Sequence, residues 1–211
     1  MKLHNYFRSG TSHRLRIALN LKGLTYEYLV VNLLKEEHLQ DEFKRINPQG
    51  FVPVLEVGER VLIQSPAIIE WLEEQFPSPA LLPTDSIDRQ YVRSLAALIG
   101  CDIHPVNNRR ILQKLRHEFN ASESQVNGWC NQWISDGFDA LEQLLQSDRS
   151  RKGFCFGSSP TIADVYLIPQ IESARRFNVS LSQWPNIQAV EESCLSFDAF
   201  KNAAPGTQID A

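Results

Sequence analysis

The chain has 211 residues, of which 43% are hydrophobic and 22% are charged, and its net charge is −4 at neutral pH. This composition is typical of a globular protein with one compact domain or two modest ones, and no apolar run in the sequence approaches the ~18 residues that a membrane span needs. The acidic balance gives no basic surface for nucleic acid. We therefore expect neither a membrane nor a nucleic acid as a partner, and anion binding must come from local clusters.

The cysteines are far apart and form no C-x-x-C pair, which argues against a zinc site and against a disulfide framework. They are Cys101, Cys130, Cys155 and Cys194. The first residues, Met1 to Tyr6, show neither a long apolar segment nor a small-residue cleavage site. We expect a cytoplasmic protein with reduced thiols and no bound metal.

The beginning of the sequence predicts alternating strands and helices. Residues 2–7 indicate a short strand, apolar residues at helical spacing follow, and Gly23 is placed to end that helix. Residues 26–31 alternate and are rich in β-formers, which predicts a second strand. The charged stretch 35–46 predicts a short exposed helix that ends before Pro48.

A hairpin and a third helix complete this part of the chain. Residues 52–57 and 60–63 flank Gly58 and Glu59, which is typical of a β-hairpin. Ser65 then has the position of an N-cap with proline in the first turn, and the helix should run to about Gln75. The predicted order is β-α-β-α-β-β-α.

Beyond this unit the pattern becomes helical. Residues 77–83 contain three prolines and suit a linker, so we place a domain boundary there, with domains at 1–80 and 86–211. Apolar residues at helical spacing predict helices over 86–118, 122–147, 161–176 and 186–203. Thr161 and Asp164 form a predicted capping box with a structural role.

A cluster of small polar residues marks the start of the first predicted helix: Ser9, Gly10, Thr11 and Ser12. The cluster contains no cysteine, and the neighbouring His13 has no acidic residue nearby to orient it. Helix N-termini favour negative charge, so this start and the one at Ser65 could together bind an anion. Ser65 by itself is typical of an ordinary helix cap, and Gln64 beside it favours a ligand amine or carboxylate.

Six motifs, in order along the chain, resemble the zeta class of glutathione transferases, which contains maleylacetoacetate and maleylpyruvate isomerases. They are RSGTSHRLRIALNLKG, NPQGFVPVL, QSPAIIEWLEE, CDIHPVNNRRIL, FCFGSSPTIADVYLIPQIESARRFNV and FDAF. The resemblance covers essentially the whole chain. It implies the glutathione transferase fold, with an α/β thioredoxin-like domain over residues 1–80 and an all-α domain over 86–211.

The resemblance also implies how the chain holds glutathione. Ser9, Gly10 and Thr11 would hold the sulfur end, and Val52, followed by a cis Pro53, would pair with the peptide backbone. The other implied contacts are Gln64 and Ser65 to the γ-glutamyl group, His38 to the glycine carboxylate, and Asp102, His104, Asn108 and Arg109 from the helical domain or a partner subunit. From the residues alone, His38 is equally typical of a solvated helix, and His104 of a helix irregularity.

One departure from the family pattern concerns the reactive group. Zeta-class proteins commonly carry S-S-C-[SA] where this chain has Ser9-Gly10-Thr11-Ser12, so Thr11 replaces the cysteine. An enzyme that uses the thiol of glutathione needs only donors that stabilise a thiolate, and a hydroxyl at a helix N-terminus lowers a thiol pKa from ~8.5. We expect Ser9 to be the main donor and Thr11 the second choice.

Arginines in family-matched positions indicate the substrate. Arginine binds carboxylates through two parallel hydrogen bonds, so Arg8, Arg110 and Arg176 are candidates for holding a small dicarboxylate, although adjacent arginines are commonly just solvated. Bacterial maleylacetoacetate isomerases often have leucine at the position of Arg109. The additional arginine here favours the shorter, more polar maleylpyruvate.

The resemblance therefore implies a glutathione-dependent cis-trans isomerase of aromatic catabolism that converts maleylpyruvate to fumarylpyruvate by reversible thiolate addition. It also implies a homodimer. Three alternatives stay open. These are isomerisation of maleylacetoacetate, a general glutathione transferase acting on α-halo acids, and a non-catalytic binding module; the hydroxyls, Gln64 and Ser65 argue against the last.

Overall fold

The computed structural model describes residues 1–148 and 150–211. The chain separates into two compact units, of which the first comprises Met1–Leu81 with Leu195–Ala211 and the second comprises Leu82–Cys194. No helix in the described part of the chain is long and apolar enough to cross a membrane.

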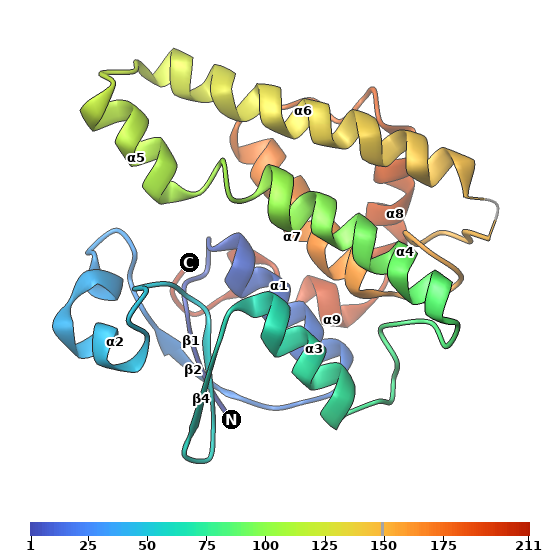
Figure 1. Cartoon of the computed structure of the whole chain (residues 1–211), viewed down its shortest axis with the longest axis horizontal. Coiled ribbons are helices and arrows are strands. Elements are labelled where there is room, and N and C mark those ends of the chain that lie inside the picture. The colour runs from blue at the N-terminus through green and yellow to red at the C-terminus, as the bar shows by residue number, and fades with distance from the viewer. Residues whose placement is uncertain (149) are drawn as a thin grey trace. The chain divides into compact units, whose positions relative to one another are not determined.

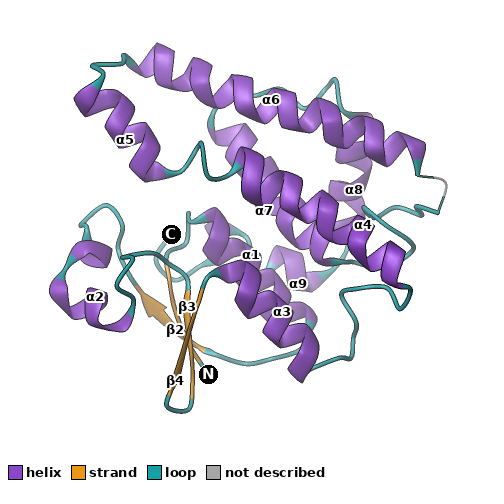
Figure 2. Ribbon diagram, viewed as in Figure 1, coloured by secondary structure: helices purple, strands orange, loops and turns teal. Residues whose placement is uncertain are grey.

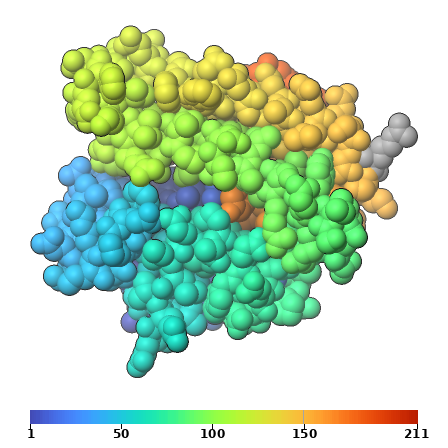
Figure 3. All heavy atoms as spheres, in the orientation of Figure 1, coloured from blue at the N-terminus to red at the C-terminus, as the bar shows by residue number. Residues whose placement is uncertain are grey.

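The first unit is built on a four-stranded mixed sheet with the order β2-β1-β3-β4. Its strands are drawn in orange in Figure 2. Its strands are β1 (Lys2–Asn5), β2 (Glu27–Val30), β3 (Val54–Val57) and β4 (Arg60–Ile63). Strand β1 is parallel to β2 and antiparallel to β3, so Leu3 lies opposite both Tyr28 and Leu55. The β3–β4 hairpin turns at Gly58, whose φ is +59°, and it projects from the surface (Figure 3).

Four α-helices accompany the sheet: α1 (Gly10–Leu21), α2 (Asp41–Ile46), α3 (Ser65–Gln75) and α9 (Asp198–Lys201). The order β1-α1-β2-α2-β3-β4-α3 agrees with the prediction (Figure 1). Helix α1 packs against α3, and Leu15 and Leu55 are fully buried in this core. Each such side chain contributes about 1.5–3 kcal/mol on burial.

Three local predictions for this unit can be compared with the structure, and two of them need correction. The first strand ends at Asn5 because Tyr6 enters a turn, in which its carbonyl accepts from the Ser9 N–H at 3.0 Å. The stretch 35–46 is not one helix, since a 3₁₀ turn (Glu37–Leu39) precedes α2 and extended Gln40 separates them. Gly23 does end α1 as predicted, with a φ of +67°.

The second unit is helical, with α4 (Ser86–Ala97), α5 (Arg109–Glu118), α6 (Glu123–Ser147), α7 (Ile162–Arg176) and α8 (Pro185–Leu195). The predicted helix over 86–118 is interrupted by a π-helical segment (Leu98–Ile103) and a turn. Pro105 has no N–H to continue the ladder, and Asn108 caps a new helix by accepting from the Arg110 N–H at 3.1 Å. The capping box of Thr161 and Asp164 is present as predicted.

The end of the chain does not belong to the helical unit as the sequence suggested. Helix α8 ends at Leu195, extended Phe197 separates it from α9, and residues 195–211 join the first unit. Buried Arg16 donates to the Ala203 carbonyl at 3.0 Å, and Asn20 donates to the Ala199 carbonyl at 3.1 Å. These contacts hold the segment against α1.

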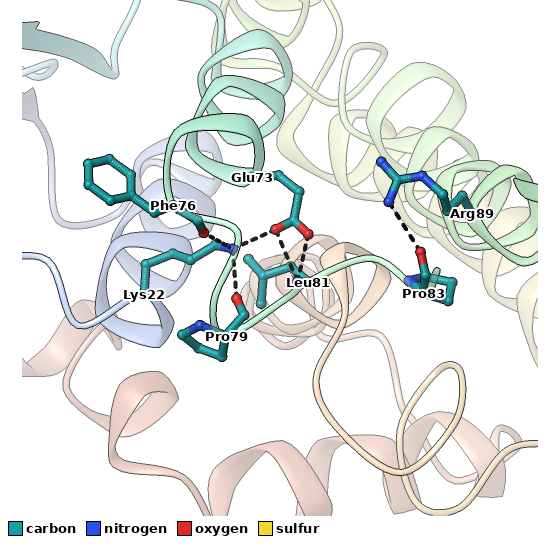
Figure 4. A network of polar contacts seen from close by, with 7 residues as sticks. All are labelled: Lys22, Glu73, Phe76, Pro79, Leu81, Pro83 and Arg89. Carbon is teal, nitrogen blue, oxygen red and sulfur yellow. Dashed lines mark hydrogen bonds and ion pairs between the residues drawn. The ribbon is translucent and has the colours of Figure 1, made fainter. Parts of the chain in front are cut away.

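A buried ion pair fixes the chain where it leaves the first unit (Figure 4). The Lys22 ammonium donates to Glu73 at 2.6 Å and to the carbonyls of Phe76 and Pro79 at 2.7 Å each. The Glu73 carboxylate also accepts from the Leu81 N–H at 3.0 Å. All three ammonium protons are therefore used, which is the condition under which a buried charge is tolerated.

Candidate functional site

The polar cluster at the start of α1 forms a continuous chain of hydrogen bonds. Ser9 is the N-cap, and its hydroxyl oxygen accepts from the Ser12 N–H at 3.2 Å. The Ser9 and Thr11 hydroxyls lie 3.0 Å apart, and the Thr11 hydroxyl lies 2.9 Å from the Val52 carbonyl oxygen. The structure thus brings together three residues that the sequence analysis assigned to one site.

The direction of this chain follows from the number of protons. Each hydroxyl has one proton, and a carbonyl oxygen can only accept, so Thr11 donates to Val52. The Ser9 proton must then lie between the two hydroxyls, and it is the proton that can turn toward an incoming anion. The N–H groups of Gly10 and Thr11, in the first turn of α1, add the positive end of the helix dipole.

The start of α3 lies in the same unit, and its geometry corrects the predicted cap. Gln64, with a φ of +67°, is the N-cap residue, and Ser65 is the first helical residue. Ser65 is buried, and its hydroxyl accepts from buried Arg14 at 3.3 Å. Gln64 donates to Gln49 at 2.5 Å, and its own side chain is exposed. The positive φ reverses the chain after β4, so the serine falls inside the helix.

The backbone around His38 approaches the turn before Val52 closely. Gly50 has a φ of +63°, and a Cβ added there would lie 2.8 Å from the His38 carbonyl oxygen. Only glycine therefore allows the two segments to meet. The Val52-Pro53 peptide bond that follows is cis.

Two buried basic residues on α1 were not among the residues predicted from the sequence to have a role. Arg14 and Arg16 are 3% and 0% exposed, although arginine is rarely buried without partners. The signal was present, since Arg14 and Arg16 flank Leu15 within a helix whose other residues from Ser12 to Leu19 are also buried. His13 is buried beside them, and burial followed by the Arg16 charge lowers its pKa to about 3. His13 is therefore neutral and is unsuited to act as a base near pH 7.

The buried cysteines offer no activated thiol. Burial raises the pKa of Cys130 to about 11, and burial together with Asp164 raises the pKa values of Cys155 and Cys194 further. The remaining cysteine, Cys101, is exposed, and all four are free. No group of three or more metal-ligating side chains occurs within residues 1–148 and 150–211.

Most of the predicted site residues of the second unit lie on one segment, between the π-helical turn and the start of α5. Asp102 is exposed, while His104, Asn108 and Arg109 are partly buried. Arg109 and Arg110 occupy the first turn of α5, where the helix dipole disfavours cations. This placement of positive charge destabilises the start of α5, and a bound anion would offset the destabilisation.

The other arginines of the predicted substrate site, and the arginine adjacent to one of them, occupy different environments. Arg8, in the first unit, is exposed, and its guanidinium lies 6.0 Å from the centre of the Phe7 ring. In the second unit, Arg175 binds both carboxylate oxygens of Glu191, at 2.5 and 2.6 Å. Arg176 is exposed and lies 5.0 Å above the Phe177 ring. Arg176 also donates to the Ser173 hydroxyl at 3.5 Å, and it is the member of this adjacent pair that was predicted to bind the substrate.

Comparison with known proteins identifies the family of this chain. The N-terminal and C-terminal domain models of glutathione S-transferases match residues 8–75 and 132–192. The chain is 63% identical to a maleylpyruvate isomerase from a Ralstonia species, and the match covers 100% of both chains. A holo structure of a maleylpyruvate isomerase, described as a bacterial zeta-class glutathione transferase, matches with a TM-score of 0.99, 63% identity and full coverage of both chains. The chain belongs to the zeta class of glutathione transferases.

Two further members of the family carry a different substrate name. A maleylacetoacetate isomerase from Pseudomonas aeruginosa is 48% identical over 100% of this chain and 98% of its own. A maleylacetoacetate isomerase from Methylobacterium extorquens, solved with bound malonate and glutathione, has a TM-score of 0.97 and 32% identity over 100% and 99% of the two chains. These matches confirm the zeta class and the glutathione transferase fold that the sequence motifs indicated.

Proposed function

We propose that this zeta-class protein is a glutathione-dependent cis-trans isomerase that converts maleylpyruvate to fumarylpyruvate. The observation that carries the proposal is the directed hydrogen-bond chain from Ser9 through Thr11 to Val52. These hydrogen bonds leave the Ser9 hydroxyl able to donate to a bound thiolate. The buried cysteine thiols of the protein itself stay protonated. The full-length relationship to a maleylpyruvate isomerase supports the choice of reaction.

The residues of the first unit fit glutathione as the source of the sulfur. The Ser9 hydroxyl and the N–H groups of Gly10 and Thr11 would hold the thiolate, because both act as donors at the positive end of α1. The Val52 backbone would pair with the peptide. The further proposed contacts are Gln64 and Ser65 to the γ-glutamyl group, His38 to the glycine carboxylate, and Asp102, His104, Asn108 and Arg109 near the tripeptide.

When bound, glutathione supplies the thiol that adds to the cis double bond and leaves after rotation about the resulting single bond. The chain itself provides the charges that stabilise each state. Ser9 keeps the sulfur ionised, and Arg8, Arg110 and Arg176 would hold the two carboxylates and the negative charge that develops on the conjugated ketone. Such fixed electrostatic stabilisation is usually the largest single contribution to catalysis.

The choice between maleylpyruvate and maleylacetoacetate rests on Arg109 and on the relatives. Two adjacent arginines at the start of α5 suit a short, strongly anionic substrate. The maleylacetoacetate isomerase from Pseudomonas aeruginosa, at 48% identity, makes that substrate the second candidate. The test is to compare kcat/KM for maleylpyruvate, maleylacetoacetate and dichloroacetate with saturating glutathione.

We expect maleylpyruvate to give the highest kcat/KM. A higher value for maleylacetoacetate would assign the second candidate, and a higher value for dichloroacetate would assign a general glutathione transferase. Inactivity on all three substrates, together with no retention on immobilised glutathione, would indicate a non-catalytic module and contradict the proposal.

We also propose that the protein is a homodimer, as the family resemblance implies, with Asp102 near a ligand of the partner subunit, and that it is cytoplasmic, as its scattered cysteines indicate. Light scattering coupled to gel filtration measures the mass in solution. A mass of twice 24.1 kDa is expected, and a mass of one chain would contradict the dimer.

A further inference from the structure

We infer that Arg16, Tyr28 and Asp210 form a clamp that positions the Ser9 loop, so that residues 195–211 set the geometry at which the thiolate is stabilised. We name these three residues the tail clamp. The inference rests on the proposed function, because it concerns the same thiolate. It extends that function to residues that lie outside the ligand contacts.

Asp210 connects the end of the chain to the residue that precedes Arg8. One of its carboxylate oxygens accepts from the Phe7 N–H at 3.0 Å, and the other accepts from the Tyr28 hydroxyl at 2.5 Å. Tyr28 lies on β2, opposite Leu3 of β1, so the rigid sheet holds the carboxylate in place. In Figure 1 the C-terminal label lies beside the start of α1, in agreement with these contacts.

Arg16, which lies on α1, binds the same segment around Phe7. Its side chain is fully buried, and it donates to the Phe7 carbonyl at 3.0 Å and to the Asn5 side chain at 3.0 Å. A third donation, at 3.0 Å, goes to the Ala203 carbonyl in the segment 195–211. Both the N–H and the C=O of Phe7 are therefore held by the clamp, one by Asp210 and one by Arg16.

The segment held in this way leads directly to Ser9. The Ser9 N–H donates to the Tyr6 carbonyl at 3.0 Å, which closes a turn over Phe7 and Arg8. A shift of Phe7 therefore moves the Ser9 hydroxyl relative to the N–H groups of α1. A displacement of about 1 Å at a reacting group can lower a rate by ~10²-fold. Asp210 and Arg16 are accordingly positioning residues, since both bind the backbone of Phe7 and act on Ser9 only through it.

The experiment uses two substitutions at one position with a matched control. D210A removes both acceptors, whereas D210N can keep both hydrogen bonds: its amide oxygen can accept from the Phe7 N–H, and its amide N–H can donate to the Tyr28 hydroxyl oxygen. Y28F removes only the hydroxyl and is the milder variant if D210A unfolds. D198A is the control, because Asp198 lies in the same segment and pairs only across 3.3 Å with Lys201, with its side chain 85% exposed.

The readout is the ultraviolet absorbance of the thiolate of bound glutathione as a function of pH, together with kcat and KM for maleylpyruvate. We expect D210A to shift the pH at which half of the bound glutathione is ionised upward by ~0.5, which lowers the thiolate fraction about threefold at pH values well below that midpoint. We expect it to lower kcat ~5- to 20-fold with little change in the KM for maleylpyruvate. Y28F should show a smaller loss, and D210N and D198A should match the wild type.

Three results would overturn the inference. A wild-type thiolate signal that neither D210A nor Y28F changes would overturn the inference alone. Equal losses in D210N and D210A would do the same, because the amide can make both hydrogen bonds. The absence of any thiolate signal in the wild type would overturn the proposed function, and the inference with it.

Discussion

The Thr11 hydroxyl donates to the Val52 carbonyl oxygen across 2.9 Å. This bond joins the first turn of α1 to the segment before β3, and it uses the single proton of Thr11. Ser9, 3.0 Å away, keeps a proton that can turn toward a ligand. Thr11, at the position of the family cysteine, thus makes a structural bond, and we propose Ser9 as the thiolate donor.

The first prediction separates these two hydroxyls. S9A should lower kcat/KM for maleylpyruvate by about 10²–10³-fold, since it removes a donor to the developing charge. T11C should keep activity within about threefold, because Thr11 acts on Val52 and not on the sulfur. Steady-state kinetics with saturating glutathione measure both variants. The reverse order of effects would place the donor at Thr11.

The second prediction concerns Arg110 as a carboxylate ligand. R110A should raise the KM for maleylpyruvate about tenfold or more, because a hydrogen bond to a charged group contributes ~1.5–3 kcal/mol. R116A on the same helix is the matched control: its ion pair with Glu123 is on the surface and screened by solvent, so the KM should stay at the wild-type value. Equal KM values for the two variants would remove Arg110 from the substrate site.

The third prediction concerns stability. K22M should lower the free energy of unfolding by about 3–5 kcal/mol, because it leaves the Glu73 carboxylate buried without its counter-charge. K114M breaks an exposed ion pair with Glu118 and should cost less than about 1 kcal/mol. Urea unfolding measures both. A small effect for K22M would show that the linker segment is held by other contacts.

The fourth prediction follows from the lowered pKa of His13. Its pKa is about 3 in the folded state, against an ordinary value of 6.5, so the unfolded state binds more protons between these values. Stability should therefore fall as the pH falls from 6.5 toward 3, by up to ~1.4 kcal/mol per pH unit from this group. H13Q should flatten that slope relative to H117Q, whose histidine is exposed. Identical slopes for the two variants would show that His13 binds its proton over the same pH range in the folded and the unfolded states.

Several local signals of the sequence predicted the local structure correctly. Gly23 and Gly58 end a helix and form a turn at positive φ, and the Thr161–Asp164 pair caps α7, because each depends on residues only a few positions apart. The order of strands and helices followed from periodicity for the same reason. Ser9 and Thr11 could be placed at a helix start before their partners were known.

Contacts distant in sequence had no comparable signal. Arg16 meets Ala203 across 187 positions, and Asp210 meets Phe7 across 203, so the return of residues 195–211 to the first unit could not be read from periodicity. The inward position of Ser65 depends on the positive φ of Gln64, which a serine-proline pattern does not reveal. The family motifs identified the reaction, whereas the direction of the hydroxyl chain required coordinates.

The central claim is that the reactive sulfur comes from glutathione and not from the chain. The decisive measurement follows the loss of maleylpyruvate absorbance with purified protein, with and without added glutathione. We expect turnover that depends on glutathione, saturates with its concentration and regenerates it unchanged. The same rate in protein freed of glutathione would contradict the account.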